Sequence, residues 1–129
     1  MGKLEKDISK AVANRLDWWQ YLKVVRLHER LNSGKLQING RWVQLSQAGT
    51  PDRVAYIDVK GKCWIYWIEC KAESGGNWHD SQRVFASKFS GLDNVVYEVV
   101  SDPKQVDKTI EQITGYYDDK LNSLPEKIL

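Results

Sequence analysis

The stretch from Thr50 to Gly76, TPDRVAYIDVKGKCWIYWIECKAESGG, decides the fold of this chain. Two segments rich in strand-forming residues, 53–59 and 63–71, are separated by Lys60-Gly61, a tight-turn signal. A connection this short makes the two strands antiparallel neighbours. The start of the first strand therefore lies opposite the end of the second.

The second strand is strongly hydrophobic and yet ends in two charged residues, Glu69 and Lys71. Because side chains alternate along a strand, both lie on one face of the sheet, which is otherwise mostly apolar. Asp52 stands directly before the first strand, so the antiparallel pairing predicts that it meets them. The plain alternative for these three residues is a structural ion pair at the end of a sheet.

Two carboxylates and a lysine that converge at a strand end suit a hard divalent cation. Mg²⁺ prefers oxygen ligands, keeps several of its waters and bridges to phosphate groups. A lysine beside such an ion can hold a water molecule or offset the charge of a phosphate. The three residues therefore predict a site for metal-assisted chemistry on a phosphate.

The rest of the composition is typical of one globular domain. The chain has 129 residues, of which 42% are hydrophobic and 28% charged, and this length is enough to bury a sizeable core. No apolar run is long enough to span a membrane, and the N-terminus has no apolar signal core. We therefore expect a single domain over residues 1–129 and a cytoplasmic location.

The net charge of +2 hides an asymmetry between the two halves of the chain. Residues 1–62 carry 12 Lys and Arg against 6 Asp and Glu, whereas residues 63–129 carry 7 against 11. A basic half is compatible with a polyanionic partner such as a nucleic acid. An ordinary mixed surface explains the same numbers.

Hydrophobic periodicity predicts three helices around the strands. The order is helix, three or more strands, helix, strand and helix, and two turn signals, NSG and NGR, flank the short segment KLQI. The expected helices span 3–19, 80–90 and 103–121, and the further strands lie at 21–31, 35–38, 42–45 and 94–100.

Two polar residues lie on the apolar faces of these helices. Glu5 falls within the apolar stripe of the first helix, where a carboxylate is costly unless it is paired. Gln82 lies on the same face of the second helix as Phe85 and Phe89. Glu5 either reaches water from the edge of the stripe or points at a cation. Gln82 is either bonded to backbone groups in the core or part of a site.

The motifs resemble those of a known nuclease superfamily. GTPD (Gly49–Asp52), a spacer of sixteen residues and ECK (Glu69–Lys71) resemble the PD-(D/E)XK nucleases. The early glutamine of the next helix, Gln82, makes the pattern similar to the VRR-NUC family, and RLNSG (30–34) is similar to its small phage and bacterial members. The resemblance covers roughly residues 4–101, with the helix 103–121 following this core. It implies a restriction-endonuclease-like α/β fold, with a mixed central sheet flanked by helices in the order α-β-β-β-α-β-α.

The resemblance also implies a role for each residue of the motif. Asp52 and Glu69 are expected to bind Mg²⁺ or Mn²⁺, with the backbone carbonyl of Cys70 as a third ligand. Lys71 is expected to position the attacking water and to steady the developing negative charge. The reaction implied is hydrolysis of a phosphodiester bond that leaves the phosphate on the 5′ end.

Two further residues are assigned to the site by the same resemblance. Gln82 is expected to orient Lys71 or the attacking water. Glu5 is expected to complete the metal shell, directly or through water, although only its position on the helix supports this.

DNA is expected to be held through contacts to its backbone, which need Lys and Arg rather than groups that read sequence. The candidates lie in the hairpin region before the motif, and they are Arg26, Arg30, Lys35 and Arg41. A solvated basic face is the alternative. Trp78, in the glycine-rich loop after the site, is a candidate for stacking or for an interface.

The resemblance implies a structure-selective DNA endonuclease that resolves Holliday (four-way) junctions as a homodimer, in a bacterial cell or a phage-infected host. A general or restriction-like DNA nuclease is the first alternative, and an inactive DNA-binding module on the same fold is the second. The candidate dimer surfaces are the last helix, with Tyr116 and Tyr117, and the pair Trp18–Trp19.

Overall fold

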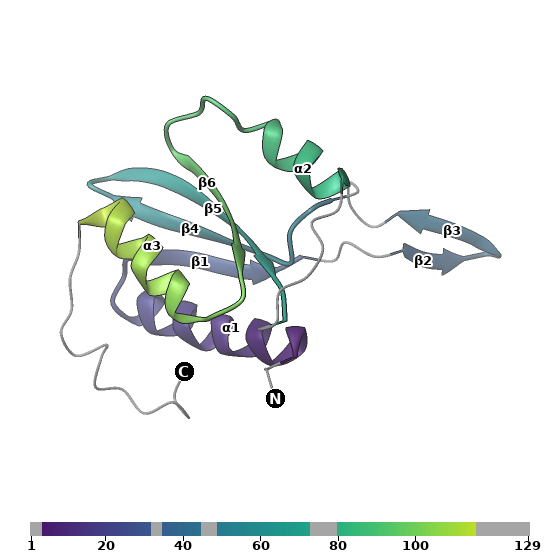
Figure 1. Ribbon diagram of the computed structural model, residues 1–129, viewed down its shortest axis with the longest axis horizontal. Helices are drawn as coiled ribbons and strands as arrows, with labels where there is room; N and C mark the ends of the chain where they lie inside the picture. The colour runs from purple at the N-terminus through teal and green to yellow at the C-terminus, as the bar shows by residue number, and fades with distance from the viewer. Residues whose placement is uncertain (1–3, 32–34, 45–48, 73–79, 116–129) are drawn as a thin grey trace.

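The structure is a computed structural model that describes residues 4–31, 35–44, 49–72 and 80–115. Three helices and six strands are seen in this part of the chain (Figure 1). In chain order they are α1 (Glu5–Tyr21), β1 (Val25–Arg30), β2 (Lys35–Ile38), β3 (Arg41–Gln44), β4 (Arg53–Val59), β5 (Lys62–Cys70), α2 (Asp80–Ser87), β6 (Val95–Val100) and α3 (Lys104–Thr114).

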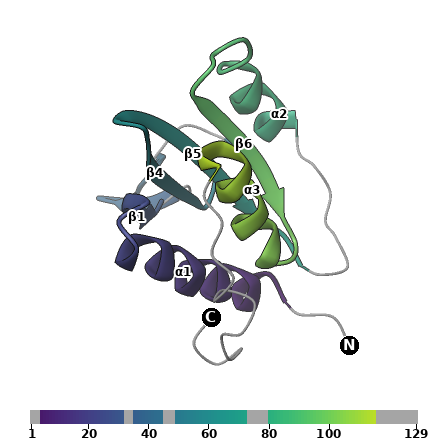
Figure 2. The ribbon, with the colours of Figure 1, turned by 90° about the vertical axis from the view of Figure 1, so that its left-hand side faces the viewer.

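The centre of the molecule is a mixed four-stranded sheet in the order β1-β4-β5-β6. β4 runs antiparallel to both β1 and β5, whereas β6 runs parallel to β5. A parallel neighbour needs a crossover, and α2 lies in that connection. Helices α1 and α3 cover one face of the sheet, and α2 lies on the other (Figure 2). The expected α/β class, with a mixed central sheet flanked by helices, is confirmed.

The strands β2 and β3 form a separate antiparallel hairpin. Figure 1 shows this hairpin projecting away from the body of the protein. Five strands therefore precede α2, and the strands expected at 35–38 and 42–45 are confirmed as β2 and β3, although the order α-β-β-β-α-β-α counts only three strands before this helix. The expected order holds for the elements of the central sheet, because the additional pair is inserted between β1 and β4.

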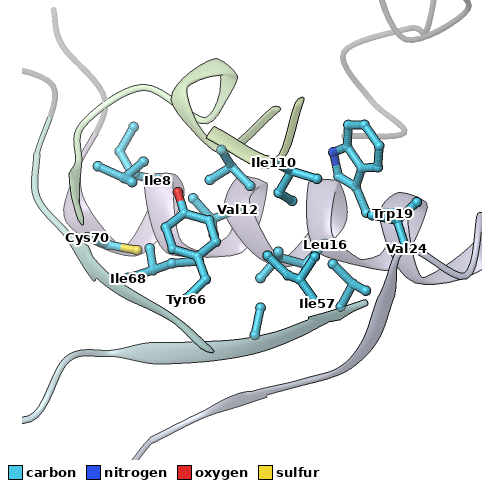
Figure 3. Packing of buried hydrophobic residues seen from close by; sticks show 14 residues of the cluster. Ile8, Val12, Leu16, Trp19, Val24, Ile57, Tyr66, Ile68, Cys70 and Ile110 are labelled. Atoms are coloured by element: carbon cyan, nitrogen blue, oxygen red, sulfur yellow. The ribbon is translucent and has the colours of Figure 1, made fainter. Parts of the chain in front are cut away.

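The core lies between the sheet and the helices α1 and α3 (Figure 3). α1 forms with an apolar stripe at helical spacing that faces the sheet. Its fully buried side chains are Ile8, Val12, Leu16 and Trp19. Each such side chain contributes about 1.5–3 kcal/mol when it is removed from water. Trp19 is 0% exposed, so the pair Trp18–Trp19 does not offer a surface for a dimer through this residue.

A buried ion pair joins α1 to α3. Arg15 Nη1 lies 2.9 Å from Asp107 Oδ2, and the indole N–H of Trp19 donates to Asp107 Oδ1 at 2.8 Å. Burial raises the pKa of Asp107, and these two partners oppose the rise. The carboxylate is thus held in the core by two specific donors, which fixes the relative position of the two helices.

The last helix ends earlier than its periodicity indicated. Asp102 Oδ1 accepts from the backbone N–H of Lys104 at 3.0 Å, which starts α3 as a side-chain cap. The helix stops at Gly115, whose φ of 70° is left-handed and whose N–H donates to Glu111 O at 2.7 Å. Glycine adopts this conformation without strain, so it ends helices readily. The expected end at residue 121 is therefore wrong, and Tyr116 and Tyr117 lie outside the described residues.

The ion pair between the helices gives a stability prediction. Asp107→Ala leaves the guanidinium of Arg15 buried without its partner, so it should lower the free energy of unfolding by about 3 kcal/mol. The double variant Arg15→Met with Asp107→Leu should recover much of this loss, because well-packed apolar residues can replace a buried ion pair. Urea denaturation measures both, and a loss below about 1 kcal/mol for Asp107→Ala would contradict the role given to the pair.

Candidate metal centre

Asp52 and Glu69 meet at one end of the central sheet. The register pairs Arg53 with Ile68, so Asp52 lies across from Glu69 at the next position. Asp52 Oδ2 accepts a hydrogen bond from the backbone N–H of Cys70 at 2.8 Å. The antiparallel pairing thus produces the encounter that the strand pattern predicted, and a backbone donor fixes the Asp52 carboxylate in place.

Glu5 brings a third carboxylate to the same place. It begins α1, where a negative side chain is favoured by the positive end of the helix dipole. Carboxylate oxygens of Glu5, Asp52 and Glu69 all lie within 4.8 Å of one another. α1 packs on the face of the sheet opposite to α2. Its N-terminus, with Glu5, therefore approaches the acidic cluster from that face. The structure thus places the least supported of the expected ligands beside the other two.

The crowding of these carboxylates has an electrostatic consequence. Burial raises the pKa of Glu69 to about 8, and the charges of Asp52 and Glu5 add to the rise, while Lys71 opposes it. Glu69 is only 4% exposed, so water compensates this repulsion poorly. A positive charge placed among the three carboxylates would therefore favour the ionised form of Glu69.

Lys71 supplies one positive charge, at the long end of ion-pair distance. Its Nζ lies 3.8 Å from Glu69 Oε1, and the residue is buried at 8% exposure. The backbone N–H of Lys71 donates to Val100 O at 2.9 Å, which extends the pairing of β5 with β6 by one residue. The ammonium group is thereby held beside the acidic cluster on the face of the sheet that carries α2.

α2 is seated against this face by aromatic packing. Phe85 meets Trp67 edge to face, with ring centroids 5.2 Å apart, an arrangement that aromatic pairs prefer. Gln82 is buried on the same side of the helix, as its spacing from Phe85 predicted. The helix therefore directs this amide toward the face that holds Glu69 and Lys71.

Gly49, the first residue of the GTPD motif, packs directly on the start of α2. Its φ is +85°, and a Cβ at this position would lie 2.0 Å from the backbone oxygen of Ser81 and 2.9 Å from the nitrogen of Gln82. Only glycine fits such a contact with backbone atoms. The residue thus ties the segment that carries Asp52 to the helix that carries Gln82.

The donor set fits a hard divalent cation. Carboxylate and carbonyl oxygens are the ligands that Mg²⁺ and Mn²⁺ take, and two oxygens bound to one Mg²⁺ are at most about 4.2 Å apart. The separation of up to 4.8 Å in the cluster is slightly wider. A small shift, or a water between Glu5 and the ion, would close this difference. The N–H of Cys70 points at Asp52, and a strand residue presents its carbonyl on the same side, so this carbonyl is also available.

The basic residues expected to hold DNA are not gathered in one place. Arg30 lies at the end of β1 that borders the site, and Arg41 is exposed on the β2–β3 hairpin. Arg26 pairs with Asp58 and lies four residues from Arg30, about 13 Å along the strand. Arg26 is therefore remote from the metal centre, and its contact with DNA stays a prediction. The side chain of Lys35 and the whole of Trp78 lie outside the described residues.

Two residues near the site were missed in the sequence. Tyr97 of β6 is paired with Trp67, and its pKa is raised by burial and by the charges of Glu69 and Asp52. Arg53 follows Asp52 directly, and burial lowers its pKa. The sequence around Tyr97 is that of an ordinary strand, so it does not indicate that this residue lies near the site. Arg53 could have been noticed as a charged residue at the start of a largely buried strand.

No family model, no curated protein and no solved structure matches this chain. Among the described residues, none of the helices combines the length and the apolar character that crossing a membrane requires.

The raised pKa of Glu69 predicts how stability depends on pH. Between pH about 4.5 and about 8, the folded protein holds a proton on Glu69 that the unfolded chain has released. The metal-free protein should therefore lose stability as the pH rises through this window, on the order of a few kcal/mol at most. Thermal unfolding in EDTA from pH 5 to pH 8 measures it.

Two comparisons make this measurement specific. Glu69→Gln should flatten the pH dependence and stabilise the metal-free protein at pH 8, whereas Glu29→Gln, an exposed glutamate of β1, should leave the dependence unchanged. Mg²⁺ should raise the melting temperature more at pH 8 than at pH 5, since it favours the ionised carboxylates. Stability that is flat or rising with pH in EDTA would contradict the electrostatics described above.

Proposed function

We propose that this protein is a metal-dependent DNA endonuclease of the PD-(D/E)XK type. The observation that carries the proposal is the joint placement of Glu5, Asp52 and Glu69 within 4.8 Å, with the Lys71 ammonium 3.8 Å from Glu69. Glu69 and Lys71 are buried, and burial of such charges costs free energy of folding, whereas Asp52 is half-buried and Glu5 is exposed beside them. The mixed sheet with helices on both faces supports a restriction-endonuclease-like core, and the motif supports membership of the VRR-NUC family.

Each residue of the cluster has a role in this proposal. Asp52 and Glu69 hold the Mg²⁺ or Mn²⁺ ion, with the Cys70 carbonyl and Glu5 completing the donor set. The hydrogen bond from the Cys70 N–H keeps the Asp52 carboxylate oriented. The bound ion supplies Lewis acidity and a water of lowered pKa. Lys71 steadies the negative charge that develops on the phosphate, and Gln82 orients Lys71 or the attacking water.

The metal site is tested by cleavage assays on matched variants. Asp52→Asn should reduce cleavage of DNA in Mg²⁺ by at least about 100-fold, because loss of outer-shell partners alone costs 10–100-fold. Asp58→Asn is the matched control, since Asp58 lies on the same strand, β4, but at its other end, where it pairs with Arg26. DNA binding by Asp52→Asn should persist, because removal of a carboxylate lowers repulsion of phosphate.

Two outcomes would contradict the proposal. If Asp52→Asn cuts DNA at the rate of the unchanged protein, the site is wrongly placed. If the unchanged protein binds DNA but does not cut it in Mg²⁺ or Mn²⁺, the protein is an inactive DNA-binding module and not a nuclease.

The proposed substrate is a four-way DNA junction, cut by a homodimer in the cytoplasm of a bacterial cell or a phage-infected host. One domain with one metal site cuts one strand at a time, whereas a junction is resolved by two cuts on opposing strands. A two-fold dimer holds two identical sites in fixed geometry, and it is the commonest closed assembly. This part of the proposal rests on the resemblance to the stand-alone VRR-NUC enzymes.

Side-by-side digestion of four-way junction, flap, duplex and single-stranded DNA tests the substrate. Symmetric cuts in the junction, at a rate above that for linear duplex, are expected, together with a dimer by light scattering at the assay concentration. A monomer that cuts linear duplex equally well would instead support a general or restriction-like nuclease.

A further inference from the structure

Two arginines face each other at the same end of the sheet as the acidic cluster. Arg30 is the last residue of β1 and Arg53 the first of β4, and the register places them directly opposite each other. Residues opposed in this way lie on the same face with their Cβ atoms close together, and like charges there are destabilising. The charge of Arg30 also contributes to the lowered pKa of Arg53, after burial as the main cause.

The nearby carboxylates make no direct ion pair with these arginines, although the charges of Asp52 and Asp17 raise the pKa of Arg53 and so oppose the effect of Arg30. Asp17 Oδ1 lies 2.7 Å from His28 Nε2, and Asp52 accepts from the Cys70 N–H within the acidic cluster. Within the part of the chain that the structure describes, no carboxylate lies at ion-pair distance from the guanidinium of Arg30 or Arg53. Two adjacent positive charges are thus left available to an anion from outside.

The pair has a defined position relative to the metal centre. Arg53 directly follows Asp52, so their side chains point to opposite faces of the sheet. Arg53 Nε donates to Ser9 Oγ at 3.2 Å, and Ser9 lies one helical turn after Glu5 on α1. The arginines therefore flank the acidic cluster on its α1 side. Arg53 is half-buried and anchored, whereas Arg30 is exposed on the outer strand.

We propose that Arg30 and Arg53 form a clamp for a backbone phosphate of DNA, next to the phosphodiester held at the metal centre. The inference rests on the proposed function, in that DNA is the ligand. The planar fork of a guanidinium matches the oxygens of phosphate, and a phosphate between two such forks relieves their repulsion. Contacts of this kind carry no sequence information. The clamp thus sets the affinity and the register of the strand that enters the site.

The clamp is tested by the binding of fluorescently labelled duplex and four-way junction DNA, followed by anisotropy in EDTA so that no cleavage occurs. Arg30→Gln and Arg53→Gln should each weaken binding about tenfold, which is the scale of one charge-assisted contact. Each should also reduce the slope of log affinity against log salt by about 1 on duplex DNA. Arg26→Gln is the matched control, because Arg26 lies on the same strand as Arg30 but pairs with Asp58 at the far end of the sheet.

Thermal unfolding separates a binding role from a structural one. Without DNA, Arg30→Gln should leave the melting temperature unchanged or raise it, because the substitution removes a like-charge contact. A residue that merely held β1 in place would lower the melting temperature when replaced. Arg53→Lys keeps the charge but loses the fork, so its affinity should fall between those of the unchanged protein and Arg53→Gln.

The outcomes distinguish the clamp from the nuclease proposal. Equal losses for Arg26→Gln and the two clamp variants would replace the clamp with a diffuse basic surface. If both clamp variants bind and cut DNA like the unchanged protein, the clamp is overturned and the nuclease proposal is retained. Binding that depends on the clamp, in a protein that cuts nothing in Mg²⁺ or Mn²⁺, would support the clamp and overturn the proposed catalysis. Absence of DNA binding by the unchanged protein would overturn both.

Discussion

The antiparallel pairing of β4 with β5 is the constraint on which the candidate site depends. It sets Arg53 against Ile68, and the next position then brings Asp52 across from Glu69. A shift of one residue in this register would turn every side chain of one strand to the other face. The core protects the register, because Tyr66 and Ile68 are fully buried under α1 and α3. Packing on one face of the sheet thus positions the charges on the other.

Charges that repel one another gather where the strands end. Glu69 is buried beside two other carboxylates, and Arg53 lies opposite Arg30. Neither arrangement favours folding, and hydrogen bonds hold both in place: the Cys70 N–H donates to Asp52, and Arg53 Nε donates to Ser9 Oγ. A cation for the first group and an anionic phosphate for the second would relieve both. Local destabilisation of this kind is characteristic of functional sites in otherwise consistent structures.

The β2–β3 hairpin belongs to the same end of the molecule. It leaves the sheet after β1 and returns to Asp52, whose backbone oxygen accepts from the N–H of Leu31 at 2.7 Å. Trp42 on the hairpin is 69% exposed, unlike Trp19 in the core. A two-stranded hairpin has little stability by itself, and this bond joins the residues that precede and follow the hairpin in the chain, directly beside the site.

The sequence by itself determined the elements and the pairing of β4 with β5. Apolar spacing marked α1, and the short turn after Val59 gave an antiparallel pair, so the meeting of Asp52 with Glu69 was predictable. Local patterns also indicated that Gln82 faces inward, which its burial confirms. The parts that failed depend on contacts that periodicity does not contain. Gly115 ended α3, although the apolar spacing continued to residue 121. The tertiary structure brings Glu5 beside Asp52, as the family resemblance implied. It alone placed Arg30 opposite Arg53 and Gly49 against α2, because each contact joins elements far apart in the chain.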